Sequence, residues 1–176
     1  MDVDGEGRDH IMQVSLRDFS ASDAAIINRL AVASFSQYST DFQDWPAMVR
    51  VLEKMSDMAA NAEIIIAEHE GRVVGAVGYV PPSVPKSAHF KPEWPIVRML
   101  VVDPDARGLG AGRALTEACM TRARRDRAPE IALHTSPIMT VALPMYLRMG
   151  FVRIRDAPPL FGVPYAIYMK ALERAV

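Results

Sequence analysis

One stretch organises the hydrophobic and polar positions of this chain. Residues 97–102 form a mostly apolar run, which is typical of a strand buried on both faces of a sheet. Asp103-Pro104-Asp105 then predicts the end of the strand, because proline cannot donate to a sheet ladder and aspartate favours turns. Glycines follow at the alternate positions 108, 110 and 112, and residues 113–123 have helical spacing. The pattern predicts a strand, a turn, a glycine-rich loop and a helix in succession.

The remaining segments predict a mixed sheet with helices packed on it. Strands are predicted at residues 11–16, 63–67, 72–80, 130–135, 151–155 and 165–172, and helices at residues 22–34, at 46–58 and within 137–149. Pro46 suits a first helical position, and five prolines predict an irregular loop over residues 81–95. The order β-α-α-β-β-β-α-β-α-β-β belongs to the α/β class, with helices on both faces of the sheet.

Length and composition are those of an ordinary globular domain. The chain has 176 residues, of which 50% are hydrophobic and 23% are charged, and its formal net charge is −1. Residues 1–10 are polar, so a flexible tail is expected there instead of a signal peptide, followed by one domain over residues 11–176. No stretch approaches the roughly 20 apolar residues of a membrane span. The balanced charge argues against nucleic acid or a membrane surface as the main partner.

The single cysteine, Cys119, excludes a disulfide within the chain. This suits a reducing compartment, so a cytoplasmic protein is expected. Its place one turn after Leu115 predicts a small buried hydrophobic side chain and not a nucleophile. The sequence leaves assembly as a homodimer open.

A strand that leads through glycines into a helix N-terminus is suited to bind an anion. Amide N–H groups converge there, the helix dipole adds about half a positive charge, and glycine lets the anion approach the backbone. A P-loop needs Gly-Lys-Ser/Thr, whereas Gly112 is followed by Arg113-Ala114, and the glycine spacing does not match G-x-G-x-x-G. The pattern that fits is Arg-x-x-Gly-x-Gly over residues 107–112. A tight turn that binds no ligand is the alternative.

Residues 97–113, with Val-Asp-Pro before this loop, resemble the GNAT (GCN5-related) N-acetyltransferase superfamily. The element order also resembles the GNAT fold, a mixed central sheet with helices on both faces, over roughly residues 11–172. The resemblance implies acetyl-CoA as the co-substrate and no metal. It implies that the coenzyme A pyrophosphate is held by Arg107, Gly108, Leu109, Gly110, Ala111, Gly112 and Arg113. It further implies that backbone groups of Leu100, Val101 and Val102 pair with the pantetheine arm, and that an N–H there holds the thioester oxygen.

Residues 142–151 resemble a second hallmark of the family, with the spacing Ala-x-x-x-Tyr-x-x-x-Gly-Phe, and Tyr146 lies 39 residues beyond Arg107. In the family this tyrosine donates a proton to the departing coenzyme A thiolate. A phenol with a pKa near 10 stays protonated at pH 7 for that task. The alternative is a tyrosine that only packs in the core. Two residues depart from the pattern: Met139 stands where Asn is frequent, and Pro144 lies inside the helix, which is therefore expected to begin late, near Leu143 or Pro144.

An acceptor amine must lose protons around the time it attacks the thioester. A lysine-like amine has a pKa of about 10.4, so its neutral form lies roughly 4–5 kcal/mol uphill at pH 7. His134 is a candidate base, because some GNAT enzymes have a catalytic Glu at this place and a histidine pKa near 6.5 suits the role. A half-buried histidine bonded to the backbone is the alternative. Glu93 is a second candidate, for which a solvated loop position is expected.

The resemblance implies that the acceptor is a primary amine of a small molecule or peptide. Its site is expected between residues 35–45 and 81–95, and the aromatic side chains there suggest an amphipathic or partly apolar acceptor. The sequence thus predicts an acetyl-CoA-dependent N-acetyltransferase that works by direct attack in a ternary complex. Two alternatives stay open: a non-catalytic acyl-CoA-binding sensor module, and a phosphate- or nucleotide-binding regulatory domain.

Overall fold

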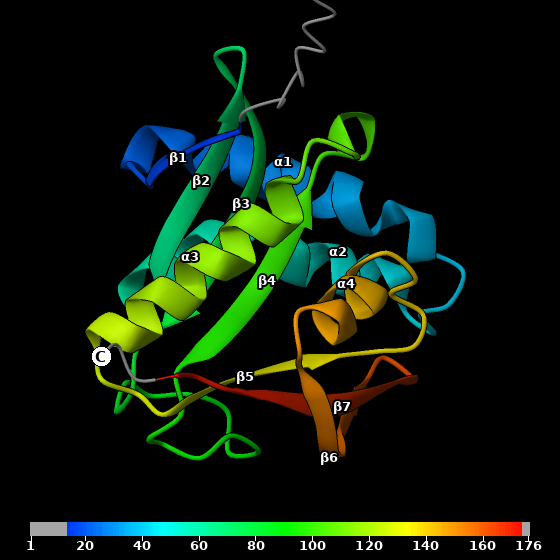
Figure 1. Cartoon of the computed structure of the whole chain (residues 1–176). Helices are drawn as coiled ribbons and strands as arrows, with labels where there is room; N and C mark the ends of the chain where they lie inside the picture. Colours follow the sequence, from blue (N-terminus) through cyan, green and yellow to red (C-terminus); the bar gives the residue numbers. More distant parts are fainter. Residues whose placement is uncertain (1–13, 174–176) are drawn as a thin grey trace, which may run out of the picture.

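The computed structural model describes residues 14–173, whose seven strands form one mixed sheet (Figure 1). The strands are β1 (Ser15–Asp18), β2 (Glu63–His69), β3 (Arg72–Val80), β4 (Ile96–Val102), β5 (Glu130–Thr135), β6 (Val152–Leu160) and β7 (Val163–Ala171). They lie in the order β1-β2-β3-β4-β5-β7-β6, and only β4 and β5 run parallel. The predicted tail and the first residues of the predicted first strand lie outside the described residues.

Helices cover both faces of the sheet, as predicted. On one face α1 (Ala24–Phe35) and α2 (Trp45–Leu52) bury Ile27, Leu30 and Leu52 against the sheet. On the other, α3 (Ala111–Arg125) and α4 (Ala142–Arg148) bury Leu115 and Tyr146 (Figure 1). Four short 3-10 helices complete the described chain: η1 (Ala21–Asp23), η2 (Ser36–Tyr38), η3 (Met55–Ala60) and η4 (Pro104–Ala106). No helix within residues 14–173 is long and apolar enough to cross a membrane.

The predicted helix over residues 46–58 is wrong in its second half. The helix α2 begins as expected, with the Asp44 carboxylate accepting the Ala47 N–H, but it ends at Leu52. The N–H of Ser56 donates to the Asn28 side chain at 2.8 Å instead of continuing the helical ladder. This contact with α1 turns the chain into η3, which buries Met55 completely. A tertiary hydrogen bond therefore decides where the helix ends.

The last two strands are longer than predicted and form a hairpin. The strand β6 continues through Pro158 and Pro159, which an edge strand tolerates because it leaves N–H positions unpaired. At the turn, Phe161 and Gly162 both have positive φ, 44° and 79°. The Phe161 carbonyl accepts the Gln43 N–H at 2.9 Å. The hairpin tip is thereby held against the segment between α1 and α2.

The feature that creates room in this fold is the divergence of β4 from β5. The two strands pair only where Ile96, the first residue of β4, meets Ala132 of β5, and then they separate (Figure 1). Beyond Ile96 the β4 backbone has β3 on one side and no β5 partner on the other. The helix α4 lies beside the opening in Figure 1. Cavities form on this side of β4.

Candidate active site

The glycine-rich loop adopts the geometry that an anion site needs. The strand β4 ends at Val102, and Asp103 accepts the Asp105 N–H at 2.9 Å, which caps the short η4 turn. Gly108 and Gly110 both have positive φ, 85° and 79°, a conformation that favours glycine. A Cβ at either position would meet no atom within 4 Å, so both backbone segments border open space. The loop leads directly into the 15-residue helix α3.

Gly112 has a different role from the two glycines before it. A Cβ there would lie 3.4 Å from the Met145 sulfur and 3.7 Å from the side chains of Leu100 and Val102. These are ordinary van der Waals distances, so the first turn of α3 packs against β4 and α4 here. Gly112 therefore lies where the helix N-terminus contacts the tyrosine-bearing helix.

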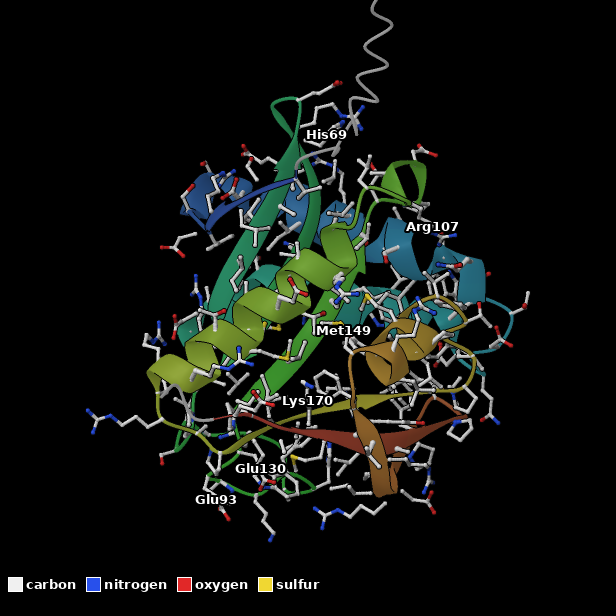
Figure 2. All side chains as sticks on the ribbon, in the orientation of Figure 1. His69, Glu93, Arg107, Glu130, Met149 and Lys170 are labelled. Carbon is white, nitrogen blue, oxygen red and sulfur yellow. The ribbon has the colours of Figure 1, made fainter. Side chains whose placement is uncertain are left out.

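A cavity of about 410 Å³ lies over this loop. Eight of the predicted cofactor residues line it: Leu100, Val102, Arg107, Gly108, Gly110, Ala111, Gly112 and Arg113. Arg148 and Tyr38 add to the lining, which contains no carboxylate. Figure 2 shows Arg107 toward the upper right of the molecule, and Gln37 and Tyr38, which follow α1, line the same cavity. The cationic lining and the helix N-terminus fit a diphosphate.

The other two predicted cofactor residues contribute no side chain to the cavity. Val101 is fully buried in the core between β4 and the α1 face, and Leu109 packs on the α3 side of the sheet. Only their backbone groups are left for a ligand. The free edge of β4 beside the opening includes the Val102 N–H, which donates to Ser34 Oγ from α1 at 3.4 Å.

A bulge in β4 changes the face of the sheet to which the following side chains point. The register with β3 shifts between Gly78, which pairs with Arg98, and Ala76, which pairs with Val101, and Met99 has a φ of 53°. Ile96 packs with the α1 face before the bulge, and Met99 and Val101 do so after it. A regular strand alternates strictly, so Ile96 and Val101 would otherwise lie on opposite faces. The bulge therefore lets Ile96 and Val101 share one face, and residues 97–100 between them line a cavity.

A second cavity, of about 260 Å³, contains both predicted catalytic side chains. Tyr146 and His134 line it, together with apolar residues from α1, α2, the proline-rich loop and β6. Phe35, Leu100, Met139 and Ala142 line both cavities. The two spaces therefore meet at the bulged part of β4.

Tyr146 is 5% exposed, and its ring packs edge-to-face on Phe151 with centroids 5.6 Å apart. Its hydroxyl makes no hydrogen bond to any residue between 14 and 173, and Tyr146 lines the cavity. Burial, with a smaller effect from Cys119, raises the pKa of Tyr146 above its ordinary value. Cys119 is itself fully buried, as predicted, which raises the pKa of its thiol to about 12. Tyr146 is accordingly a neutral hydrogen-bond donor at pH 7.

The helix that carries Tyr146 begins at Ala142, slightly earlier than predicted. Pro144 stands in its first turn, where backbone N–H groups lack intrahelical partners, so the missing N–H costs little. Gly150 ends the helix with a φ of 93°, and β6 starts at Val152. Met139 is buried at the junction of the two cavities, so that junction is apolar at this point.

His134 lies on β5 inside an aromatic group. Its ring centroid is 5.0 Å from that of Tyr165, 5.3 Å from that of His89 and 5.6 Å from that of Phe90. Burial, followed by the charges of His89 and Arg98, lowers the pKa of His134 to about 4. Its Nδ1 atom is buried and has no hydrogen-bond partner among the described residues. The imidazole is neutral at pH 7 and able to accept a proton.

Glu93, the other candidate base, does not reach the site. It is exposed, lines neither cavity, and lies far from Arg107 in Figure 2. Some of the aromatic side chains that were expected around the acceptor also lie elsewhere. Phe42 and Trp94 are buried in the core, and the Trp94 indole donates to Glu130. Phe35 and Phe90 do line the second cavity.

Sequence reasoning missed one charged residue of the site. Arg98 lines the second cavity and is exposed, although it lies within a central strand. The signal was available, because an arginine interrupts an apolar run that was predicted to be buried on both faces.

Comparisons with known proteins agree with this geometry. The sequence model of the acetyltransferase (GNAT) family matches residues 24–151. A mycothiol acetyltransferase from Sanguibacter keddieii is 35% identical over 145 residues, which cover 80% of this chain and 44% of that relative. The chain therefore spans less than half of that relative's length.

Solved structures show the same fold. A GCN5-related N-acetyltransferase from Rhodopseudomonas palustris has a TM-score of 0.72 at 22% identity, covering 90% of this chain and 95% of the other. A GNAT family acetyltransferase from Elizabethkingia anophelis, solved with acetyl-CoA bound, has a TM-score of 0.65 at 13% identity, covering 90% and 98% of the two chains. The family match spans the glycine-rich loop, the diverging strands and the tyrosine helix, and the chain belongs to the acetyltransferase (GNAT) family.

Proposed function

We propose that this protein transfers the acetyl group of acetyl-CoA to a primary amine by direct attack within a ternary complex. The observation that carries the proposal is the meeting of two cavities at the bulge of β4. One holds the glycine-rich loop with Arg107, and the other holds Tyr146 and His134. A molecule with an anionic end in the first cavity and a reactive end at the junction would present that end to both side chains.

Residues of the first cavity are suited to hold the coenzyme. The loop amides around Gly108 and Gly110 and the N-terminus of α3 would bind the pyrophosphate, and the Arg107 guanidinium adds charge. The unpaired edge of β4 after Ile96 would accept the pantetheine arm as an added strand. When bound, acetyl-CoA supplies an activated acyl group whose thioester carbon is open to attack by an amine.

Tyr146 acts as the hydrogen-bond donor to the leaving thiolate sulfur. Its raised pKa keeps the phenol protonated across the physiological range. The same shift makes complete proton transfer to a thiolate less favourable, since each pKa unit corresponds to about 1.4 kcal/mol. The hydroxyl therefore first stabilises the developing negative charge, and the proton follows as sulfur departs.

His134 serves as the base at a late stage of the attack. With a pKa of about 4, it is too weak to deprotonate a free ammonium group. The amine nitrogen becomes much more acidic once it has bonded to the carbonyl carbon, and a neutral imidazole can take that proton. The acceptor thus enters as its neutral amine, and His134 removes the proton that would otherwise reverse the addition.

Release of free thiol from acetyl-CoA, measured over a broad panel of primary amines, tests this function. Acetylated product, identified by mass, should form in proportion to the thiol released. Calorimetry should show that acetyl-CoA and CoA bind more tightly than ATP. A preference for ATP would contradict the proposal.

A non-catalytic acyl-CoA-binding module is the second candidate. One observation favours it: no Asp or Glu lines either cavity, so no carboxylate base is present there. This candidate predicts acetyl-CoA binding without transfer to any amine of the panel.

A further inference from the structure

Arg98 is a cation of the second cavity that has no counter-charge among the described residues. Arg98 makes no hydrogen bond and no ion pair with any residue between 14 and 173. The cavity lining contains no Asp or Glu, and His134, whose pKa the Arg98 charge helps to lower, is neutral at pH 7. The guanidinium is therefore free to bind an anion that enters the cavity.

Lys86, the other cation in the lining, already makes hydrogen bonds within the protein. Its ammonium group donates to the carbonyl oxygens of Val84 and Pro92 at 2.8 Å and of Pro81 at 3.3 Å. These bonds tie together the proline-rich loop, and the charge of Glu93 acts on the same ammonium group. All three of its donors are thus used in shaping the loop.

The fold directs Arg98 to the acceptor side of the site and not to the coenzyme side. It is paired with Gly78 directly before the bulge, and it lines only the second cavity. Its neighbour Leu100 stands where the two cavities meet. An anion on Arg98 would accordingly lie in the cavity that Tyr146 and His134 also line, and its volume of about 260 Å³ suits a compact acceptor.

We propose that the acceptor is a compact amine that carries an anionic group, a carboxylate or a phosphate, bound by Arg98. The inference rests on the proposed function, since it names the substrate class of that same site. The guanidinium binds either anion with paired N–H donors, and this charge-assisted contact orients the amine toward the β4 bulge. Met48, Leu52, Phe90 and Leu160 line the rest of the cavity and would hold an apolar side chain. An α-amino acid with an apolar side chain has all three groups that the site would bind: an amine, an anionic group and an apolar side chain.

Matched acceptors test this substrate class. Leucine and leucinamide have the same side chain, but only leucine has a carboxylate. The amine of leucinamide is less basic, so leucinamide would be the better acceptor if the carboxylate charge had no effect. We expect kcat/KM for leucine to exceed that for leucinamide by roughly tenfold or more. Aminoethyl phosphate compared with ethanolamine tests the phosphate arm in the same way.

The variant Arg98→Gln should remove this preference. It should lower kcat/KM for the preferred anionic acceptor by roughly 10- to 100-fold, mainly through KM, and leave the neutral partner unchanged. Arg50→Gln is the matched control, because Arg50 is an exposed arginine of α2 that lines neither cavity. Neutral acceptors that are faster than their anionic partners in both pairs, with rate ratios unaltered by Arg98→Gln, would overturn the inference while the acetyltransferase function stands.

A binding measurement separates the inference from the function. Calorimetric titration of leucine and of aminoethyl phosphate into the CoA-loaded protein should show saturable binding of at least one of them, and Arg98→Gln should abolish it. If such binding occurs but no amine is acetylated, the proposed reaction fails and the ligand class stands. If neither anionic amine binds, the inference fails whatever the activity.

Discussion

The imidazole rings of His134 and His89 lie nearly parallel, 21° apart, with their centroids at 5.3 Å. Each ring has a buried nitrogen without a hydrogen-bond partner among the described residues, Nδ1 of His134 and Nε2 of His89. Burial lowers the pKa of both side chains. A proton on either ring therefore disfavours a proton on the other, and the pair stays neutral at pH 7.

This pair makes folding stability depend on pH. The pKa of His134 is about 4 in the folded chain and about 6.5 in an unfolded one. Between these values the unfolded chain binds more protons, so the free energy of unfolding should fall as the pH falls through this window. The full effect of His134 is on the order of 3 kcal/mol below pH 4. Urea titrations of the wild type and of His134→Gln at pH 7.5 and pH 5 should show a smaller loss in the variant.

The contribution of His89 can be measured separately. His89→Gln removes one of the charges that lower the pKa of His134, so that pKa should rise in the variant. Histidine NMR titration measures it directly. A His134 pKa near 6.5 in the wild-type protein would contradict the buried, neutral arrangement.

Replacing Tyr146 by Phe tests the donor to the leaving group. We expect kcat to fall about a hundredfold, because the hydrogen bond to the thiolate is lost, while the Kd for acetyl-CoA changes little. The free energy of unfolding should change by less than ~1 kcal/mol, since the hydroxyl bonds to no described residue. Tyr165→Phe, at another tyrosine of the same cavity, is the control. An unchanged kcat would remove Tyr146 from the mechanism.

Gly110→Ala tests the anion site, with Gly71→Ala as its control. Both glycines have positive φ, 79° and 76°, and a Cβ at either would meet no protein atom within 4 Å. Each substitution should cost about 1–2 kcal/mol of stability from backbone strain. Only Gly110→Ala should weaken acetyl-CoA binding, by roughly tenfold or more, because Gly110 borders the cavity and Gly71 lies in the β2–β3 hairpin turn. Equal Kd values for the two variants would contradict the assignment of the loop.

The β6–β7 turn offers a test of the acceptor wall. At Gly162, whose φ is 79°, a Cβ would lie 2.2 Å from Gln43 Cδ. Gly162→Ala should displace the exposed Gln43 side chain and strain the turn that follows Leu160, which lines the second cavity. We expect the KM for the acceptor to rise and the Kd for acetyl-CoA to stay constant.

Gln43→Ala provides the partner for a double-mutant cycle. It removes the clashing side chain but keeps the backbone N–H that donates to Phe161. The double variant should recover part of the acceptor affinity that Gly162→Ala loses, with a coupling of at least ~0.5 kcal/mol. Strictly additive effects would show that the contact does not transmit the change.

Local patterns predicted most elements because they depend on neighbours in sequence. The strand over residues 130–135 and the hairpin strand over 72–80 occur with the predicted bounds. The helix α2 ends at Leu52 although the helical spacing of apolar residues continues. The Ser56 N–H donates to the Asn28 side chain, and the residues next to Ser56 in sequence cannot indicate a partner 28 residues away. The extension of β6 through two prolines likewise depends on its place at the sheet edge.

By itself the sequence determined the local conformation of the loop and of the tyrosine helix, because glycine spacing, a strand ending in Asp-Pro and a helix-ending glycine all act within a few residues. The tertiary structure decided which cavities the loop and the tyrosine helix border. The divergence of β4 from β5 opens the cavities, and the bulge at Met99 shifts the facing of β4 around Arg98. Burial lowers the pKa of His134 and raises that of Tyr146. Strand register and burial arise from contacts between distant segments, so the pattern of residues along the chain does not contain them.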